Sequence, residues 1–101
     1  MIIYNVTYSV ANSIEEQWLN WMTEIHIPEI LNTRSYIRYQ LVKIIDIDED
    51  GSATYAVQYY AQTKQNHVQF INLHDTSFKL KCSRQWGEEV LSFGTLMQIV
   101  Q

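Results

Sequence analysis

The residues best suited to chemistry in this chain lie within WLNWMTEIHIPEIL, residues 18 to 31. His26 stands two residues before the only proline, Pro28, and follows two tryptophans, Trp18 and Trp21. A histidine in apolar surroundings can accept a proton from a substrate, because its ordinary pKa is near ~6.5 and burial disfavours its charged form. His26 is therefore a candidate catalytic residue, acting as a general base.

A structural explanation of His26 competes with the catalytic one, and we favour it. Pro28 has no N–H to donate, and its ring crowds the carbonyl four residues back, so a helix is expected to kink or end near it, with one further turn possible through Leu31. A ring nitrogen of His26 could then hydrogen-bond a carbonyl that Pro28 leaves without a partner. The sequence leaves both interpretations open.

The other potential ligating residues do not form a metal site. His67 and His74 lie seven residues apart on one expected helix, which is about 10 Å along its axis and too far for both to bind one ion without a bend. The run from Asp46 to Gly51 imitates the start of a calcium loop, but Val57 stands where the loop needs a glutamate. We expect an acidic, solvated hairpin tip there.

Composition and charge limit the classes of function. A chain of 101 residues is expected to form one domain, residues 1–101. Its net charge is −4 and it has no dense basic cluster, so nucleic acid is not an expected partner. Its apolar runs are too short to span a membrane. The single cysteine, Cys82, cannot form an intramolecular disulfide, and no signal segment is recognised, so we expect a cytoplasmic location.

Hydrophobic periodicity predicts the elements that position these residues. Residues 2–10 alternate as a half-buried strand. Ser13 opens a capping box with Glu16 and starts a helix. The apolar stripe of this helix is expected to hold Ile14, Trp18, Trp21, Met22 and Ile25.

The second half of the chain repeats this alternation of strand and helix. Residues 36–47 and 52–61 are predicted strands joined at Asp50-Gly51. A helix from Thr63 to a stop at Gly87 is expected to bend near residues 75–77, and residues 90–100 form the last strand. The stripe of this helix is expected to hold Val68, Ile71, Phe78, Cys82 and Trp86. The order βαββαβ predicts an α+β, ferredoxin-like fold with two helices on one face of a four-stranded antiparallel sheet.

The other face of this sheet is expected to be apolar. The residues assigned to it are Ile3, Tyr36, Val42, Ile44, Ala56, Tyr60 and Leu96. Helices on one side cannot cover both faces, and a large exposed apolar patch is typical of an interaction surface. We therefore expect this face to pack against a second copy in a homodimer.

Four segments carry a family resemblance that covers essentially the whole chain: MIIYNVTY, WLNWM with HIPEIL, TYAVQYY, and FGTLMQIV. They resemble an uncharacterised bacterial family, a domain of unknown function within the dimeric α+β barrel superfamily. The resemblance implies a ferredoxin-like fold whose sheets pair into a barrel across a dimer. It implies no established activity, because relatives in the superfamily include monooxygenases, isomerases and ligand-binding proteins.

Three functions fit these expectations. The first is a non-catalytic dimer, without a cofactor, that binds a small apolar or aromatic molecule between helices and sheet. The candidate ligand-binding residues are Trp18, Met22, Tyr36, Tyr60 and His74. The second is a cofactor-independent monooxygenase or isomerase acting on a small aromatic substrate with His26 as base. The third is a purely structural or protein-interaction module.

Overall fold

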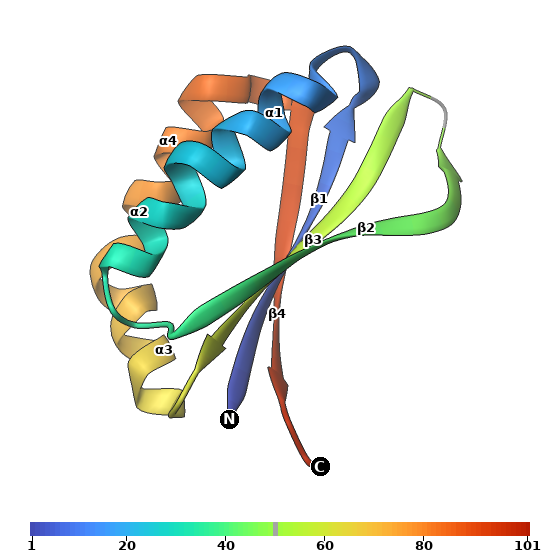
Figure 1. Cartoon of the computed structure of the whole chain (residues 1–101). Coiled ribbons are helices and arrows are strands. Elements are labelled where there is room, and N and C mark those ends of the chain that lie inside the picture. The colour runs from blue at the N-terminus through green and yellow to red at the C-terminus, as the bar shows by residue number, and fades with distance from the viewer. Residues whose placement is uncertain (50) are drawn as a thin grey trace.

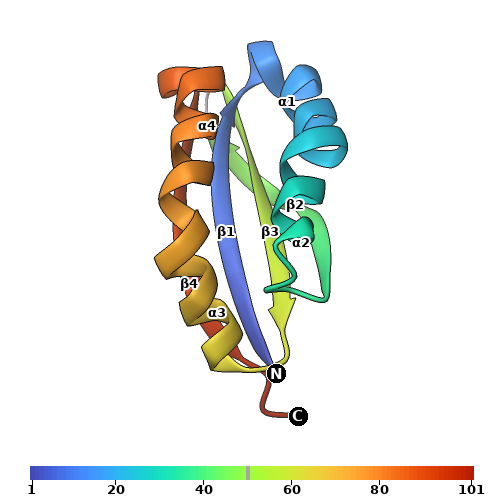
Figure 2. The ribbon, with the colours of Figure 1, turned by 90° about the vertical axis from the view of Figure 1, so that its left-hand side faces the viewer.

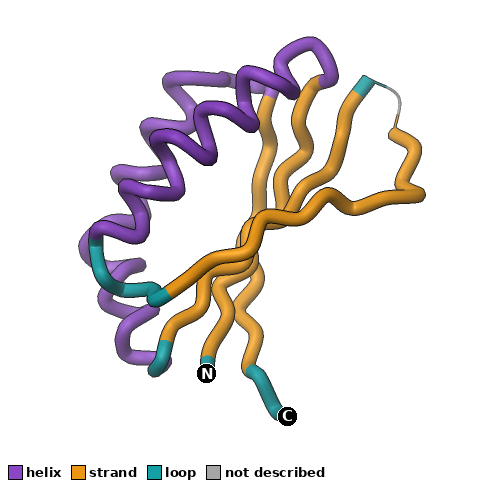
Figure 3. The backbone as a smooth tube through the Cα atoms, viewed as in Figure 1, coloured by secondary structure: helices purple, strands orange, loops and turns teal. Residues whose placement is uncertain are grey.

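The computed structural model describes residues 1–49 and 51–101, and only the backbone of residues 46–49. It contains a four-stranded antiparallel sheet in the order β2-β3-β1-β4 (Figure 1). The strands are β1 (Ile2–Ala11), β2 (Arg38–Glu49), β3 (Ser52–Ala61) and β4 (Val90–Gln98). All helices lie on one face of the sheet (Figure 3). The predicted ferredoxin-like architecture is confirmed.

Each of the two helical segments is interrupted by one wide, π-helical turn. The first comprises α1 (Glu15–Trp21), the π turn η2 (Met22–His26) and α2 (Ile27–Asn32). The second comprises α3 (Lys64–Phe70), the π turn η3 (Ile71–Asp75) and α4 (Thr76–Trp86). Short 3₁₀ turns, η1 (Asn12–Ile14) and η4 (Gly87–Glu89), join them to the strands. Figure 2 shows the two segments side by side over the sheet.

The start of the first helix is where the sequence predicts it, but the capping box is wrong. A 3₁₀ turn contains Ser13, and no side chain caps this turn or α1. The carboxylate of Glu15, in the first turn of α1, instead accepts hydrogen bonds from the Tyr55 hydroxyl of β3 and the Lys43 ammonium of β2. This helix start is thus tied to the sheet and not to its own backbone.

The π turn η2 changes which residues of the first helix face the core. The N–H of Ile27 donates to the carbonyl of Met22, five residues back. Pro28 follows at the first turn of α2, where a missing N–H is tolerated, and the helix continues to Asn32. A π turn shifts the later side chains backward around the axis. Ile25 is therefore 47% exposed, against prediction, while His26 and Ile27 are buried.

The second helix also departs from its predicted stripe, in the residues before and at the start of its π turn η3. His67 and Phe70 are buried, whereas Val68 is only half-buried and Ile71 is 37% exposed, so the predicted stripe is wrong in its first half. The expected irregularity occurs one turn earlier than residues 75–77. The two ends of this helix are where the sequence predicts them. The Thr63 hydroxyl caps its start, and Gly87 ends α4 with a positive φ of 58°.

The strand register defines the two faces of the sheet. Residues directly opposite in an antiparallel pair share a face, so the pairings of β1 with β3 and β4, and of β3 with β2, assign every strand. The helix-free face holds Ile3, Val42, Ile44, Ala56 and Tyr60, as predicted. It also holds Leu91, Phe93 and Met97 of β4.

Two residues assigned to the helix-free face lie on the helix side. Leu96 pairs with Tyr4, which packs against the core. Tyr36 precedes β2, is 3% exposed, and forms a 2.8 Å hydrogen bond between its hydroxyl and Nδ1 of His67. The strand therefore begins two residues later than expected, since Tyr36 turns toward α3. The acidic run falls on residues 46–51, where neither Asp50 nor the side chains before it are described.

Candidate functional site

A cavity of about 560 Å³ lies between the second helical segment and strands β1 and β4. Aromatic rings of the sheet and of the second helical segment form much of its wall, including Tyr4, Tyr8, Phe70 and Phe78. Its polar lining includes His26, Tyr59, Asp75 and Lys79. A mostly apolar hollow with a few convergent polar groups is the usual form of a small-molecule site.

Small residues on β4 explain why this side of the sheet is hollow. Tyr8 has Tyr55 of β3 on one side and Ser92 of β4 on the other. In the next helix-facing row, Val6 stands between Val57 and Gly94. Strand β3 thus presents large side chains to the helices where β4 presents a hydroxymethyl group and a hydrogen atom. The missing side-chain volume forms the cavity.

Gly94 also admits the ring of Tyr4. A Cβ atom at position 94 would lie 2.7 Å from Cε1 and 3.0 Å from the hydroxyl oxygen of Tyr4, which is closer than real Cβ contacts. The Tyr4 ring therefore lies across β4 as one wall of the cavity. Glycine is required here by a close approach and not by its backbone conformation.

His26 is brought to the cavity by the π turn, of which it is the last residue. Its side chain is stacked on Trp21, with ring centroids 4.6 Å apart, and meets the edge of Phe78 at 5.6 Å. Burial lowers its pKa to about 4, while Glu29 opposes and Lys81 adds to this shift. The imidazole is therefore neutral at pH 7. Within the described residues its ring makes no side-chain hydrogen bond to a carbonyl freed by Pro28, yet neither ring nitrogen is among the fully buried atoms that lack a partner.

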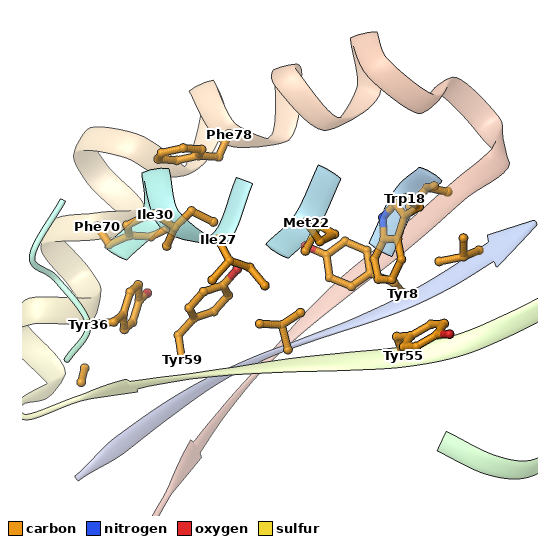
Figure 4. Close-up of a cluster of buried hydrophobic side chains, with 14 residues drawn as sticks. Tyr8, Trp18, Met22, Ile27, Ile30, Tyr36, Tyr55, Tyr59, Phe70 and Phe78 are labelled. Atoms are coloured by element: carbon orange, nitrogen blue, oxygen red, sulfur yellow. The ribbon is translucent and has the colours of Figure 1, made fainter. Parts of the chain in front are cut away.

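Tyr59 is the second buried polar group of the cavity. It points from β3 toward the helix layer (Figure 4), and the residue is 1% exposed. Its hydroxyl finds no hydrogen-bond partner within the described part of the chain. Burial raises its pKa well above the ordinary value. A buried hydroxyl without a partner is costly and rare in native proteins.

Asp75, the last residue of the second π turn, is one of the charged residues of the lining. Its Oδ1 accepts a long, 3.5 Å hydrogen bond from the Tyr4 hydroxyl. Its Oδ2 lies 2.9 Å from Nζ of Lys79. Burial, and next the charge of Asp75, raise the pKa of Tyr4 to about 12. Each π turn therefore ends with a polar residue at the cavity, His26 in one case and Asp75 in the other.

The candidate residues chosen from sequence are dispersed. Of the six, His26 lines the cavity. Trp18 and Met22 are fully buried in the core under the first helix (Figure 4). Tyr36 is hydrogen-bonded to His67, Tyr60 lies under the guanidinium of Arg38 on the helix-free face, and His74 packs against Phe70.

Sequence reasoning missed Tyr59 and Asp75. Tyr59 lies on β3 in the segment TYAVQYY, two residues after Val57. The strand alternation could have identified it, because Tyr59 shares its face with the buried Val57. Asp75 could not be placed, since its position depends on the π turn.

The described residues hold neither a cluster suited to a metal ion nor a helix suited to span a membrane. No three His, Cys, Asp or Glu side chains in residues 1–49 and 51–101 are grouped closely enough to hold a metal ion. Each helix in these ranges is too short or too polar to cross a lipid bilayer.

Solved structures with the same fold include proteins of several descriptions. A dimeric ferredoxin-like protein from an uncultured marine organism superposes with a TM-score of 0.67 at 10% identity, covering 99% of this chain and 96% of the other. A putative antibiotic biosynthesis monooxygenase from Deinococcus radiodurans gives 0.65 at 10% identity, covering 100% and 94%. SnoaB, a cofactor-independent oxygenase from Streptomyces nogalater, gives 0.62 at 11% identity, covering 99% and 94%.

These likenesses establish the fold alone. They do not extend to activity, because identities near 10% carry no information on it. No curated protein matches the sequence. The model of one family, described as a domain of unknown function (DUF4286), matches residues 1–100. The chain belongs to the DUF4286 family.

Proposed function

We propose that the protein is a homodimer that binds a small, mostly apolar molecule in the cavity between β1, β4 and the second helical segment. The observation that carries this proposal is an aromatic cavity lined by His26 and by Tyr59, whose buried hydroxyl has no hydrogen-bond partner in the described chain. A ligand could give the Tyr59 hydroxyl, which the fold otherwise buries at a cost, a hydrogen-bond partner, and it could also hydrogen-bond His26.

The helix-free face supports the homodimer. Leu91 and Phe93 of β4 are 63% and 64% exposed there, and Val42 and Ile44 of β2, at the opposite edge of the sheet, are half-buried. Burying such a face against its own copy removes apolar surface from water and protects it from unspecific association. A structural neighbour described as dimeric and ferredoxin-like is consistent with this arrangement.

A second candidate function is catalysis by a cofactor-independent monooxygenase or isomerase. The position of His26 at the cavity favours it, since a neutral imidazole can accept a proton from a bound substrate. A pKa of about 4 makes the free imidazole a weak base, however. Ligand binding is therefore the first proposal, with proton transfer conditional on a ligand that raises this pKa.

Native mass spectrometry of the freshly purified protein tests the cavity. We expect extra mass of a small organic molecule, which Ser92→Leu should remove because the longer side chain enters the cavity. Ser77→Leu is the matched control, as Ser77 is exposed on α4 and does not line the cavity. If Ser92→Leu retains the extra mass, the ligand lies elsewhere and the proposal is wrong. If the wild-type protein shows no extra mass, its binding to 2-naphthol, naphthalene and 2-naphthoate is measured instead.

The same spectra test the dimer. We expect the native protein to have twice the chain mass, and Val42→Glu to be monomeric because it places a charge among the apolar residues of the helix-free face. Circular dichroism controls for folding of the variant. A folded Val42→Glu dimer would show that this face is not the interface. For the catalytic alternative, ligand-dependent oxygen uptake or product formation lost in His26→Gln would support an enzyme.

A further inference from the structure

The polar groups of the cavity restrict the charge of its ligand. We propose that the cavity selects an uncharged aromatic compound bearing a hydroxyl group, and that it discriminates against the corresponding carboxylate. This inference rests on the proposed ligand-binding function and adds the chemical class of the ligand.

The first step is the hydrogen-bonding capacity of Tyr59 and His26, the two polar side chains considered at the cavity. The Tyr59 hydroxyl offers one donor and can also accept, and a neutral His26 offers one ring donor and one ring acceptor. A ligand hydroxyl likewise donates one hydrogen bond and accepts others. It can therefore donate to the imidazole and accept from Tyr59, which gives the buried Tyr59 hydroxyl a partner.

The second step is the charge of the lining. The acidic side chains that line the cavity are those of Asp75 and Glu88. Its ammonium group, that of Lys79, is already 2.9 Å from Asp75. A ligand carboxylate would thus lose its hydration without gaining a free cation, and it would meet a nearby carboxylate. Burying an unpaired charge is strongly unfavourable.

The third step is the shape of the cavity. Rings of Tyr4, Tyr8, Phe70 and Phe78 form its walls, and planar ligands gain contact from stacked or edge-on packing against such rings. A volume of about 560 Å³ accommodates two fused aromatic rings with room to spare. A naphthalene skeleton is therefore a suitable probe for the polar end of the site.

Equilibrium dialysis with three probes at pH 7 tests the proposal: 2-naphthol, naphthalene and 2-naphthoate. They share one ring system and differ only in the polar group. We expect 2-naphthol to bind about tenfold more tightly than naphthalene, which corresponds to roughly 1.4 kcal/mol. We expect 2-naphthoate to bind more weakly than 2-naphthol by at least the same factor.

Tyr59→Phe identifies the group responsible. Its affinity for 2-naphthol should fall several-fold toward that for naphthalene, with the remainder due to the hydrogen bond to His26, while its affinity for naphthalene stays unchanged. The lost hydroxyl has no partner in the described chain, so the variant should fold with an undiminished Tm. Tyr55→Phe is the control on the same strand, because Tyr55 is bonded to Glu15 and does not line the cavity. His26→Gln, which keeps a donor and an acceptor, should retain part of the preference.

The outcomes distinguish a wrong ligand class from the absence of a ligand-binding cavity. If 2-naphthoate binds as tightly as 2-naphthol, or naphthalene does, the inferred ligand class is wrong while a binding cavity remains. An unchanged 2-naphthol affinity in Tyr59→Phe also overturns it. If none of the three probes binds to a protein that carries no ligand of its own, the proposed function fails as well.

Discussion

The two halves of the space between helices and sheet are built from the same kinds of element but are filled differently. Under the first helical segment, Trp18 lies between the rings of Tyr8 and Tyr55 at 5.2 and 5.1 Å, and Met22 and Val57 are fully buried. Under the second, a cavity remains against β4. The difference teaches that the strand facing each helix decides between packing and a cavity, because both helical segments carry large side chains.

The two halves also differ in what an unpartnered polar atom means. The indole N–H of Trp18 has no partner in the described chain, as is true of the Tyr59 hydroxyl. Only Tyr59 borders the cavity. A ligand could therefore satisfy Tyr59, whereas the Trp18 N–H is a cost accepted for packing a large ring. The same feature points to function only where there is room for a partner.

The largest expected effect breaks the packed half. Trp18→Ala should lower the free energy of unfolding by about 3–5 kcal/mol, because it leaves a void in a fully packed region. Phe78→Ala is the matched change at the cavity, where the ring already lacks neighbours on one side, and it should cost at least about 1 kcal/mol less. Urea unfolding measures both. Equal costs would mean that the two halves are packed alike.

The sequence predicted the elements well because their signals are local. The order of strands and helices was predicted from the alternation over β1, the turn signal at Asp50-Gly51 and the helix stop at Gly87. This order in turn predicted the sheet. The hollow over β4 could also have been read from Ser92 and Gly94, since both occupy helix-facing positions. The prediction of a strand depends on its apolar residues, so in that prediction the two small residues gave no signal of a hollow.

The sequence could not place the candidate site, because that depends on the two π turns. A regular helix through Ile25 would leave His26 beside the core, whereas the extra residue in the turn brings it to the cavity. In the second helix the same irregularity places Asp75. Tyr36 was assigned to the wrong face since its hydrogen bond to His67 joins residues far apart in the chain. Local periodicity carries no information on either kind of interaction.

A second prediction concerns the half with the cavity, where His26 should make the free energy of unfolding depend on pH. The folded protein holds the pKa of His26 at about 4, below the ordinary 6.5 of the unfolded chain. Between these values the unfolded chain binds a proton that the folded protein does not, so the free energy of unfolding falls as the pH falls from 6.5 to 4. The loss should approach roughly 3 kcal/mol at pH 4.

His26→Phe isolates this effect, because it keeps a ring against Trp21 and Phe78 but cannot be protonated. The difference between wild type and variant, measured by urea unfolding from pH 7.5 to 4, should change mainly below pH 6.5. Other groups, such as Glu15 with its lowered pKa, contribute equally to both proteins and cancel. A difference that is constant with pH would mean that His26 is protonated as readily in the folded protein as in the unfolded chain.

The smallest expected effect sharpens the comparison at β4 itself. Replacing a glycine within a strand by alanine ordinarily stabilises a protein by about 0.5–1 kcal/mol. Gly94→Ala should instead destabilise it by about 1–3 kcal/mol, because the new methyl group would lie 2.7 Å from the Tyr4 ring. That ring cannot move freely, since it packs against His67 at 4.8 Å and its hydroxyl is bonded to Asp75.

A double-mutant cycle with Tyr4→Leu assigns the cost to this contact. If the Tyr4 ring is the obstacle, Gly94→Ala should become neutral or stabilising once the ring is gone, with a coupling energy of about 1–3 kcal/mol. Ser92→Ala, at the neighbouring helix-facing position, changes little volume and should cost little in either background. A Gly94→Ala penalty that persists without Tyr4 would place the constraint in the backbone of β4, and the hollow would then not follow from side-chain volume alone.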